Sequence, residues 1–319
     1  MERNITIGII GAGKVSRAHL IALKALNSIH NDLGVAITIK TVADINKEQA
    51  RLTAEKYGID KWTTDWHDVI NDRNIDTIII LTPPYAHKEI AIEAAKNGKN
   101  IFCEKPLALN GPDALEMWNA VNQYKVVNMV GFNYRWLPGI AFIKELIDSG
   151  RLGTIYHLDL IFYEDFAANK EYGWRYAREL SGGGVLMDLG THLIDLVHYF
   201  TNSVINWVSA NAINLLPERE GHRVNVEDWI SVLFKTENGV TGQFEASWVA
   251  LGRKNTLQIE VYGSGGSAIF NLERPNEVMI YLSSDEPKYS GYRRILLGPL
   301  HPYGYSMAYP APGAGMGYE

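Results

Sequence analysis

The sequence has few of the features that mark secreted, membrane-bound or metal-clustered proteins. Its one cysteine, Cys103, cannot form an internal disulfide, and one thiolate cannot build a zinc cluster. No apolar run reaches the roughly 20 residues of a membrane span, and the first four residues lead into a strand-like segment rather than a signal peptide. We therefore expect a soluble, cytoplasmic protein and predict no metal site.

The sequence also lacks runs of positive charge. The formal net charge is −6 and no run of lysine or arginine occurs, whereas a surface for nucleic acid or anionic membrane needs a basic patch. The composition, 46% hydrophobic and 21% charged, is that of a globular protein, and 319 residues suffice for two domains. We therefore expect two folded domains and neither nucleic acid nor a membrane as partner.

A strand, a glycine turn and a helix open the chain in that order. The apolar run 4–10 precedes Gly11-Ala12-Gly13-Lys14-Val15-Ser16, and a helical pattern follows. Gly11 permits a tight turn, Gly13 lets the backbone approach a pyrophosphate, and the helix amino end offers free N–H groups. Although Ser16 replaces the third glycine of the usual fingerprint, the order predicts a dinucleotide-binding turn.

A carboxylate, Asp44, follows the second predicted strand at 35–43. It would accept both ribose hydroxyls of the adenosine half and repel a 2′-phosphate, which favours NAD over NADP. The interval from Gly13 to Asp44 exceeds the ~20 residues commonly found, and we assign the excess to a long helix end and loop at 27–34. The alternative role for Asp44 is the N-cap of a helix at 46–57.

Strand and helix alternate through the first 131 residues. The pattern predicts further strands at 75–81, 100–103 and 126–131 and helices at 86–97 and 112–124. Such alternation implies parallel strands with right-handed crossovers. We therefore predict an α/β Rossmann domain over residues 1–131.

The second part of the chain is dominated by strand-like runs. After one helix at 137–147, apolar and polar residues alternate in runs at 155–163, 204–213, 229–234, 240–248, 256–262, 267–272 and 278–282. We expect an α+β domain over 132–319 with a large, mostly antiparallel open sheet. Its aromatic residues make the sheet a candidate homo-oligomer interface, for a dimer or a tetramer, or a substrate wall: Trp207, Phe234, Phe244 and Trp248.

Two stretches carry candidate chemistry. Lys105 follows a short apolar strand at the predicted ligand-binding edge of the parallel sheet, although a solvated loop lysine is the alternative. After a glycine-rich turn at 182–184, a helix at 185–200 would place leucines on one side and four polar residues on the other: Asp188, His192, Asp195 and Tyr199. The alternative for these four is a polar stripe facing solvent.

Asp188 and His192, at positions i and i+4, would be neighbours, so one can bond a substrate hydroxyl while the other exchanges its proton. Asp195, one turn further on, would fix the histidine tautomer. A metal site that includes His198 is disfavoured because this residue lies off the polar stripe.

Six segments spread over nearly the whole chain carry a family resemblance: Gly8–Gly13, Thr82-Pro83-Pro84 with His87, Cys103–Pro106, Asn133-Tyr134-Arg135, Gly173-Trp174-Arg175 and Gly182-Gly183-Gly184-x3-Asp188-x3-His192. They resemble the Gfo/Idh/MocA oxidoreductases, a family that includes glucose-fructose oxidoreductase and inositol 2-dehydrogenase. Glu104-Lys105-Pro106 with Asp188-x3-His192 is the most specific part. Family members continue past the position where this chain ends, so the resemblance leaves two alternatives for Glu319, a natural end or a truncation.

The resemblance also implies NAD(P) in the first domain and assigns residue roles. The catalytic residues are Lys105, Asp188 and His192. The cofactor contacts are Gly11, Ala12, Gly13, Lys14, Val15, Asp44, Thr82, Pro83, Pro84, His87, Glu104 and Lys105. For the substrate we add Trp174 as a flat face for a sugar ring and Tyr134 and Arg175 as polar partners, beside Lys105, Asp188 and His192; packing or an ion pair is the alternative for each added residue.

These groups suit the oxidation of a ring secondary alcohol of a sugar or cyclic polyol. His192 would remove the hydroxyl proton while Lys105 bonds the same oxygen, and no paired arginines are evident for a carboxylate or phosphate. Two rival functions stay open. One is an NAD-dependent glycosidase or epimerase with transient oxidation, and the other is a non-catalytic sugar-sensing regulator on the same fold.

Overall fold

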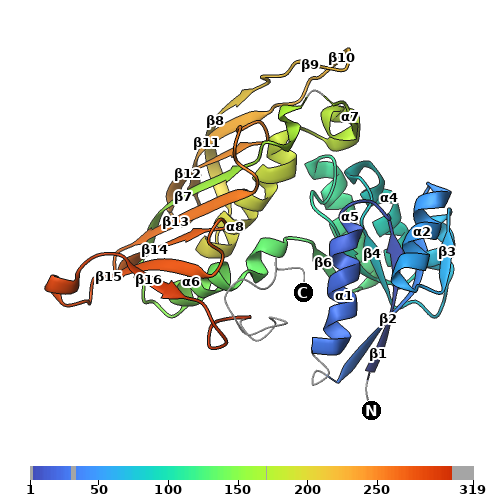
Figure 1. Ribbon diagram of the computed structural model, residues 1–319, viewed down its shortest axis with the longest axis horizontal. Coiled ribbons are helices and arrows are strands. Elements are labelled where there is room, and N and C mark those ends of the chain that lie inside the picture. The colour runs from blue at the N-terminus through green and yellow to red at the C-terminus, as the bar shows by residue number, and fades with distance from the viewer. Residues whose placement is uncertain (1–2, 30–33, 170, 304–319) are drawn as a thin grey trace. The chain divides into compact units, whose positions relative to one another are not determined.

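The computed structural model describes residues 3–29, 34–169 and 171–303, and these residues divide into two units (Figure 1). The first unit comprises the described residues up to Phe132 together with Glu179–Gly182. The second comprises Asn133–Arg178 and the described residues from Gly183 onward. The expected chain end at 313–319 and half of the expected loop at 27–34, namely residues 30–33, lie outside the described residues.

The first unit is built on a six-stranded parallel sheet with the order β3-β2-β1-β4-β5-β6. The strands are β1 (Arg3–Ile10), β2 (Val35–Ala43), β3 (Lys61–Thr63), β4 (Thr77–Ile80), β5 (Asn100–Cys103) and β6 (Asn128–Val130). The strand order reverses between β1 and β4, and open α/β sheets bind ligands at the carboxyl ends of the strands at such a point.

Helices cover both faces of this sheet because its central strands are apolar on both sides (Figure 1). They are α1 (Ser16–Ile29), α2 (Lys47–Tyr57), α3 (Trp66–Asn71), α4 (His87–Lys96) and α5 (Gly111–Tyr124). Ile9 packs in a cluster with Leu20 of α1, whereas its neighbour Ile10 packs in a second cluster with Ile90 of α4. The predicted strands and helices of this unit are confirmed within a few residues; β3 and α3 were not predicted.

The second unit contains an eight-stranded sheet with the order β16-β15-β14-β13-β7-β12-β11-β8. Only the β7–β12 pair is parallel, so the predicted mostly antiparallel sheet is confirmed. The strands are β7 (Ile155–Tyr163), β8 (Ile205–Ile213), β11 (Trp229–Thr236), β12 (Thr241–Ser247), β13 (Thr256–Gly263), β14 (Gly266–Asn271), β15 (Glu277–Leu282) and β16 (Arg293–Leu296). A separate hairpin of β9 (Glu218–Arg219) and β10 (His222–Arg223) was not predicted, nor was β16.

Helices α6 (Pro138–Asp148) and α8 (Thr191–Thr201) pack on one face of the eight-stranded sheet (Figure 1). Phe234, Phe244 and Trp248 point into this core and are at most 2% exposed. The prediction that these three aromatics lie on an open face is therefore wrong, because alternate strand residues point to opposite faces and theirs is the helix-covered one. Trp207 on β8, in contrast, is 54% exposed.

Two further observations bear on the class of site. No helix in the described part of the chain is long and apolar enough to cross a membrane. Among residues 3–29, 34–169 and 171–303, no three or more His, Cys, Asp or Glu side chains gather so as to hold a metal ion.

Candidate active site

The glycine turn after β1 has the backbone geometry that a dinucleotide site needs. Gly11 has a φ of 103°, and a Cβ there would lie 2.6 Å from the carbonyl carbon of Leu81, so a side chain is excluded. Apart from Gly13 and its two chain neighbours, no described atom comes within 4 Å of a Cβ built on Gly13, which leaves space for a close approach to its backbone. Ser16, the departure from the fingerprint, donates its hydroxyl to the Gly13 carbonyl at 2.6 Å and so tightens the turn.

Asp44 at the end of β2 joins this turn. Its Oδ2 accepts a hydrogen bond from the N–H of Ala12 at 2.8 Å, and its Oδ1 accepts one from Asn46. The N-cap of α2 is Asn46, whose side chain accepts from Gln49 N–H, so the alternative role of Asp44 as the cap is wrong. Each carboxylate oxygen keeps a second lone pair, and Asp44 can therefore also accept ribose hydroxyls.

The segment after β4 supplies the next part of the same edge. The hydroxyl Oγ1 of Thr82 is buried and makes no hydrogen bond within the described residues. A buried polar atom without a partner calls for a ligand or a water, so Thr82 fits a cofactor contact. Pro84 begins a short 3-10 helix, Pro84–Ala86, that leads into α4.

His87 has a different place from the one we predicted. Its side chain is fully buried, and the ring nitrogens face backbone oxygens on two turns: Nε2 lies 2.7 Å from the carbonyl of Thr82 and Nδ1 lies 3.0 Å from that of Pro106. Burial lowers the pKa of His87. A side chain enclosed in this way supports the two turns rather than contacting the cofactor, so the predicted direct contact is corrected.

Glu104 and Lys105 follow β5. Both carboxylate oxygens of Glu104 are engaged: Oε1 lies 2.7 Å from His19 Nε2 of α1, and Oε2 accepts the Lys105 N–H at 3.1 Å. His19 and Glu104 are each 7% exposed. The role of His19 was missed, because nothing in the sequence links a histidine on α1 to a motif 85 residues later.

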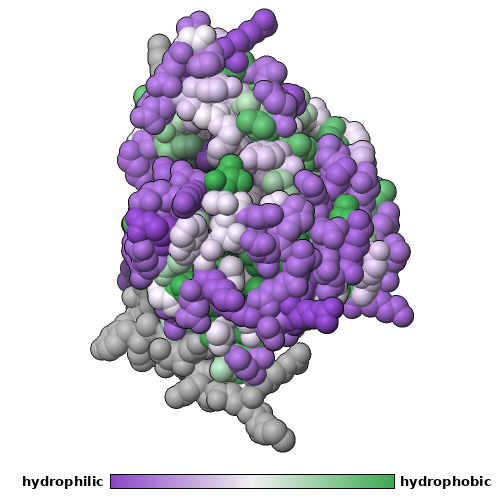
Figure 2. Space-filling view, turned by 90° about the vertical axis from the view of Figure 1, so that its right-hand side faces the viewer, coloured by the Kyte–Doolittle hydropathy of each residue, from purple (hydrophilic) through white to green (hydrophobic). Residues whose placement is uncertain are grey.

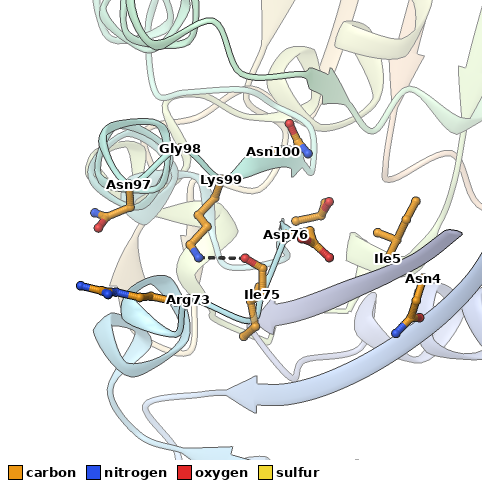
Figure 3. Close-up of a pocket in the computed structure, with 10 residues that line it drawn as sticks. Asn4, Ile5, Arg73, Ile75, Asp76, Asn97, Gly98, Lys99 and Asn100 are labelled. Carbon is orange, nitrogen blue, oxygen red and sulfur yellow. Dashed lines mark hydrogen bonds between the residues drawn. The ribbon is translucent and has the colours of Figure 1, made fainter.

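A polar hollow lies at the amino ends of the strands of the first sheet, away from the glycine turn, Asp44, Thr82 and Lys105 (Figure 3). It lies where β1, β4 and β5 begin, beside Asn4, Asp76 and Asn100. Its buried cation, Lys99, donates to the carbonyls of Asp72 and Ile75 at 2.7 and 2.8 Å. The glycine turn, Asp44, Thr82 and Lys105 all follow the carboxyl ends of strands, so the predicted cofactor residues lie at the other end of the strands.

In the second unit, Asp188 lies in a π-helical turn, Leu186–Gly190, directly before α8. The prediction of one regular α-helix over this stretch is wrong, since the π turn widens the helix at Asp188; such turns are frequent at functional sites. The turn starts close to the backbone of Glu227, and a Cβ on Gly184 would lie 2.0 Å from the Glu227 carbonyl oxygen. Only glycine fits at this position.

His192 lies in the first turn of α8 and is 4% exposed. Its ring meets Tyr134 edge-on with centroids 4.7 Å apart, and Phe162 lies 6.0 Å away. Asp195 is also buried, at 7%. The alternative interpretation as a solvent-facing polar stripe is therefore wrong for both residues.

The predicted substrate residues of the second unit lie around Asp188 and His192. Arg175 Nε is 3.5 Å from Asp188 Oδ2, and the guanidinium lies 4.5 Å over the ring of Trp174. Tyr134 contacts His192 and places its hydroxyl 3.4 Å from Asn255 Oδ1. One face of Trp174 is thus covered by its neighbour Arg175, and the role of Trp174 as a flat face for a sugar ring stays a prediction.

Asp195 does not take up the role predicted for it. Its two carboxylate oxygens accept hydrogen bonds from Nε and Nη2 of Arg135, at 2.7 and 2.5 Å. Burial raises the pKa of Asp195, and Arg135 opposes that rise. The predicted bond that fixes the His192 tautomer is replaced by a bidentate ion pair between α8 and the segment before α6.

Two family models cover most of the chain. Residues 5–132 match the oxidoreductase family with an NAD-binding Rossmann fold, and residues 140–269 match the GFO/IDH/MocA C-terminal domain. The chain belongs to the Gfo/Idh/MocA family of oxidoreductases. It therefore has an NAD-binding Rossmann domain, which agrees with the open backbone at Gly13 and the buried hydroxyl of Thr82.

Within this family, the chain is 35% identical to levoglucosan dehydrogenase of Pseudarthrobacter phenanthrenivorans, over 99% of this chain and 86% of the relative. A solved structure of levoglucosan dehydrogenase in complex with NADH and levoglucosan superposes with a TM-score of 0.95 and the same coverage. The chain is also 29% identical to scyllo-inositol 2-dehydrogenase (NAD(+)) of Bacillus subtilis, over 88% of this chain and 78% of the relative.

Proposed function

We propose that this protein oxidises a ring secondary alcohol of a sugar or cyclic polyol and transfers the hydride to NAD. The observation that carries the proposal is the placement of Asp188 and the buried His192 on successive turns, with Tyr134 against the His192 ring and Arg175 beside Asp188. Trp174 lies against the guanidinium of Arg175. The named relatives act on levoglucosan and scyllo-inositol, which are both ring compounds with several hydroxyls.

Each residue has its own proposed role in this reaction. When bound, NAD accepts the hydride from the carbinol carbon. His192 takes the hydroxyl proton, Lys105 donates a hydrogen bond to the same oxygen, and Asp188 accepts one from a neighbouring hydroxyl. The aromatic surroundings of His192 exclude water from the imidazole. The ion pair with Arg175 helps to hold the Asp188 carboxylate in place.

The cofactor is held by residues of the first unit in this proposal. The glycine turn from Gly11 to Val15 receives the pyrophosphate, with Lys14 exposed beside it. Asp44 accepts the ribose hydroxyls, which makes NADP the weaker ligand. Thr82, Pro83, Pro84, Glu104 and Lys105 continue the contact surface along the carboxyl edge of β4 and β5.

The experiment is a substrate panel with NAD, assayed both for NADH and for changed sugar products. It contains levoglucosan, myo-inositol, glucose, galactose and xylose beside lactate and a simple secondary alcohol. We expect NADH from at least one ring compound. Faster NADH formation from lactate than from every ring would refute the proposal. Altered sugar without NADH would establish the glycosidase or epimerase, and binding without any turnover would establish the regulator.

We also propose a homo-oligomer, dimer or tetramer, through the outer face of the eight-stranded sheet. Trp207 and Leu233 lie diagonally on that face, on the paired strands β8 and β11, and are 54% and 51% exposed. The face turned to the viewer in Figure 2 is, in contrast, largely hydrophilic with scattered apolar residues. Light scattering of wild type and Trp207→Lys tests this, and a monomeric wild type would refute it.

The cytoplasm is the proposed compartment. Cys103 is 1% exposed and burial raises the pKa of its thiol, so the chain carries an inert cysteine that suits a reducing environment. Fractionation of the source cells with an antibody tests the location, and recovery outside the cytoplasm would refute it.

A further inference from the structure

We propose that Arg219 and Asp228, a fully buried ion pair of the second unit, determine substrate selectivity by holding the loop that carries Trp174 and Arg175. Both side chains are 0% exposed, and Arg219 Nη2 lies 3.1 Å from Asp228 Oδ1. The inference rests on the proposed function, because selectivity presupposes a ring substrate. Both side chains are fully buried and act through the loop, so both are positioning residues.

A short hairpin delivers Arg219 into the interior. Strands β9 and β10 are joined by Glu220 and Gly221, with φ angles of 48° and 78°. Two successive positive φ angles are typical of the tight turns that join twisted antiparallel strands. Glu218 and His222 on the hairpin are exposed, whereas Arg219 points inward. The hairpin thus places a single cation inside the unit.

The guanidinium of Arg219 contacts the loop at both of its ends. Nη1 donates to the carbonyl of Ala167 at 2.7 Å and to that of Asn169 at 2.6 Å. Its Cζ lies 3.9 Å from the ring centroid of Tyr176, which directly follows Trp174 and Arg175. The Arg219 guanidinium therefore holds the loop at its start, through Ala167 and Asn169, and just after Trp174 and Arg175, through Tyr176.

Asp228 anchors the cation. Its Oδ1 also accepts from the indole N–H of Trp248 at 2.7 Å, and its Oδ2 accepts from the N–H groups of Leu215 and Leu216 at 2.9 and 2.8 Å. A buried ion pair adds little stability compared with apolar residues of equal volume, but it fixes geometry because each donor has one place to point. We therefore assign the pair a positioning role.

The neighbouring residue Glu227 holds the other side of the site. Its Oε1 accepts the N–H groups of Gly184 and Leu186, at 2.9 and 3.2 Å, where the Asp188 turn begins. Two successive carboxylates, Glu227 and Asp228, thus hold the Asp188 turn and, through Arg219, the Trp174–Arg175 loop. A shift of either segment would change the 3.5 Å contact between Arg175 and Asp188.

The test compares Arg219→Lys with Arg223→Lys, the same change at an exposed position on the same hairpin. Lysine keeps the charge but cannot bond two carbonyls and a carboxylate as a planar fork. For Arg219→Lys we expect the KM of the best ring substrate to rise by a factor on the order of 10 to 100 and the preference between two rings to change. The Kd of NADH, measured by fluorescence, should stay within about twofold of wild type. Arg223→Lys should match wild type throughout.

A folded Arg219→Lys variant with the KM and ring preference of wild type would overturn the inference. If this variant does not fold, Glu220→Asn replaces it: asparagine tolerates the positive φ, and the shorter side chain loses the 3.1 Å bond to the N–H of Tyr172. We then expect a KM rise of about twofold to fivefold, and no rise would overturn the inference. If wild type binds NADH but oxidises no ring, the proposed function fails.

The positioning role is then tested by the rate of tryptic cleavage after Arg175. A cleavage rate in the variants equal to that of wild type would overturn the positioning role.

Discussion

The imidazole of His19 lies 2.7 Å from the carboxylate of Glu104, and both side chains are buried. His19 lies on α1, the helix that follows the glycine turn, and Glu104 directly precedes Lys105. The second carboxylate oxygen of Glu104 accepts a hydrogen bond from the Lys105 N–H. Phe102 meets the His19 ring edge-on at 5.3 Å and fixes its plane. A single pair thus connects the proposed cofactor-binding turn with the proposed catalytic lysine.

Replacing His19 by alanine should therefore affect both stability and turnover. Glu104 would be left buried without its partner, and we expect a loss of about 2 kcal/mol in the free energy of unfolding, measured by urea denaturation. Turnover should fall on the order of tenfold, since Lys105 loses a fixed backbone. The control is His67→Ala, whose side chain is 52% exposed. A stable, fully active His19→Ala protein would contradict the assignment.

Asp44 should determine the preference for NAD. Asp44→Ala removes the acceptor for the ribose hydroxyls and the bond to Ala12 N–H. We expect NAD to bind on the order of 10-fold more weakly and the ratio of NAD to NADP affinity to fall. Titration of NADH and NADPH by fluorescence measures both. Asp60→Ala, at an exposed position, should leave the ratio unchanged; a wild type that prefers NADPH would remove Asp44 from this role.

Regular elements were predictable because their patterns are local. The strands at 35–43 and 155–163 were located to the residue from their apolar composition and polar borders. The three-residue strand β3 is too short to carry a period, and the π turn at Leu186–Gly190 keeps the apolar spacing of an α-helix while changing its geometry. The face toward which Trp248 points depends on the packing of α6 and α8, which the strand pattern does not contain.

Candidate site residues could be proposed from the sequence, but the contacts that support them could not. Lys105, Asp188 and His192 stand in short motifs, whereas their neighbours come from distant segments. Arg135 is 60 residues from Asp195, and His19 is 85 residues from Glu104. A hydrogen bond between such distant residues leaves no periodic signal, so the partner of Asp195 was predicted wrongly and Gln49, which donates to the Ala12 carbonyl at 2.8 Å, was missed.

Lys105→Ala and His192→Ala should each lower turnover by a factor on the order of 10² or more. Both act on the reacting oxygen in the proposed mechanism, so the Kd of NADH should change little. Lys56→Ala, at an exposed position on α2, serves as the matched control for the lysine. Near-normal kcat in either folded variant would show that the residue is structural.

The stability that the ion pair of Arg135 and Asp195 contributes should depend on pH. Burial raises the pKa of Asp195 above 3.8 in the folded protein, and Arg135 limits the rise. A raised folded pKa means that the stability contributed by protonated Asp195 is present below about 3.8 and is lost as pH rises through the folded pKa. Arg135→Met removes the cation that lowers the pKa of Asp195, so the folded pKa of Asp195 rises further. The stability lost between low and neutral pH is then larger than in wild type.

We therefore expect the melting temperature of Arg135→Met to fall further below wild type near pH 7.5 than near pH 4. At neutral pH the cost should be about 2 kcal/mol, less than the roughly 3 to 5 kcal/mol for breaking a fully buried pair, because the Arg135 side chain is 37% exposed. Asp195→Asn supplies the control: in that background position 195 carries no titratable group, and the effect of Arg135→Met should be the same at both pH values. A deficit that is equal at both pH values in the presence of Asp195 would show that Arg135 acts through packing rather than through its charge.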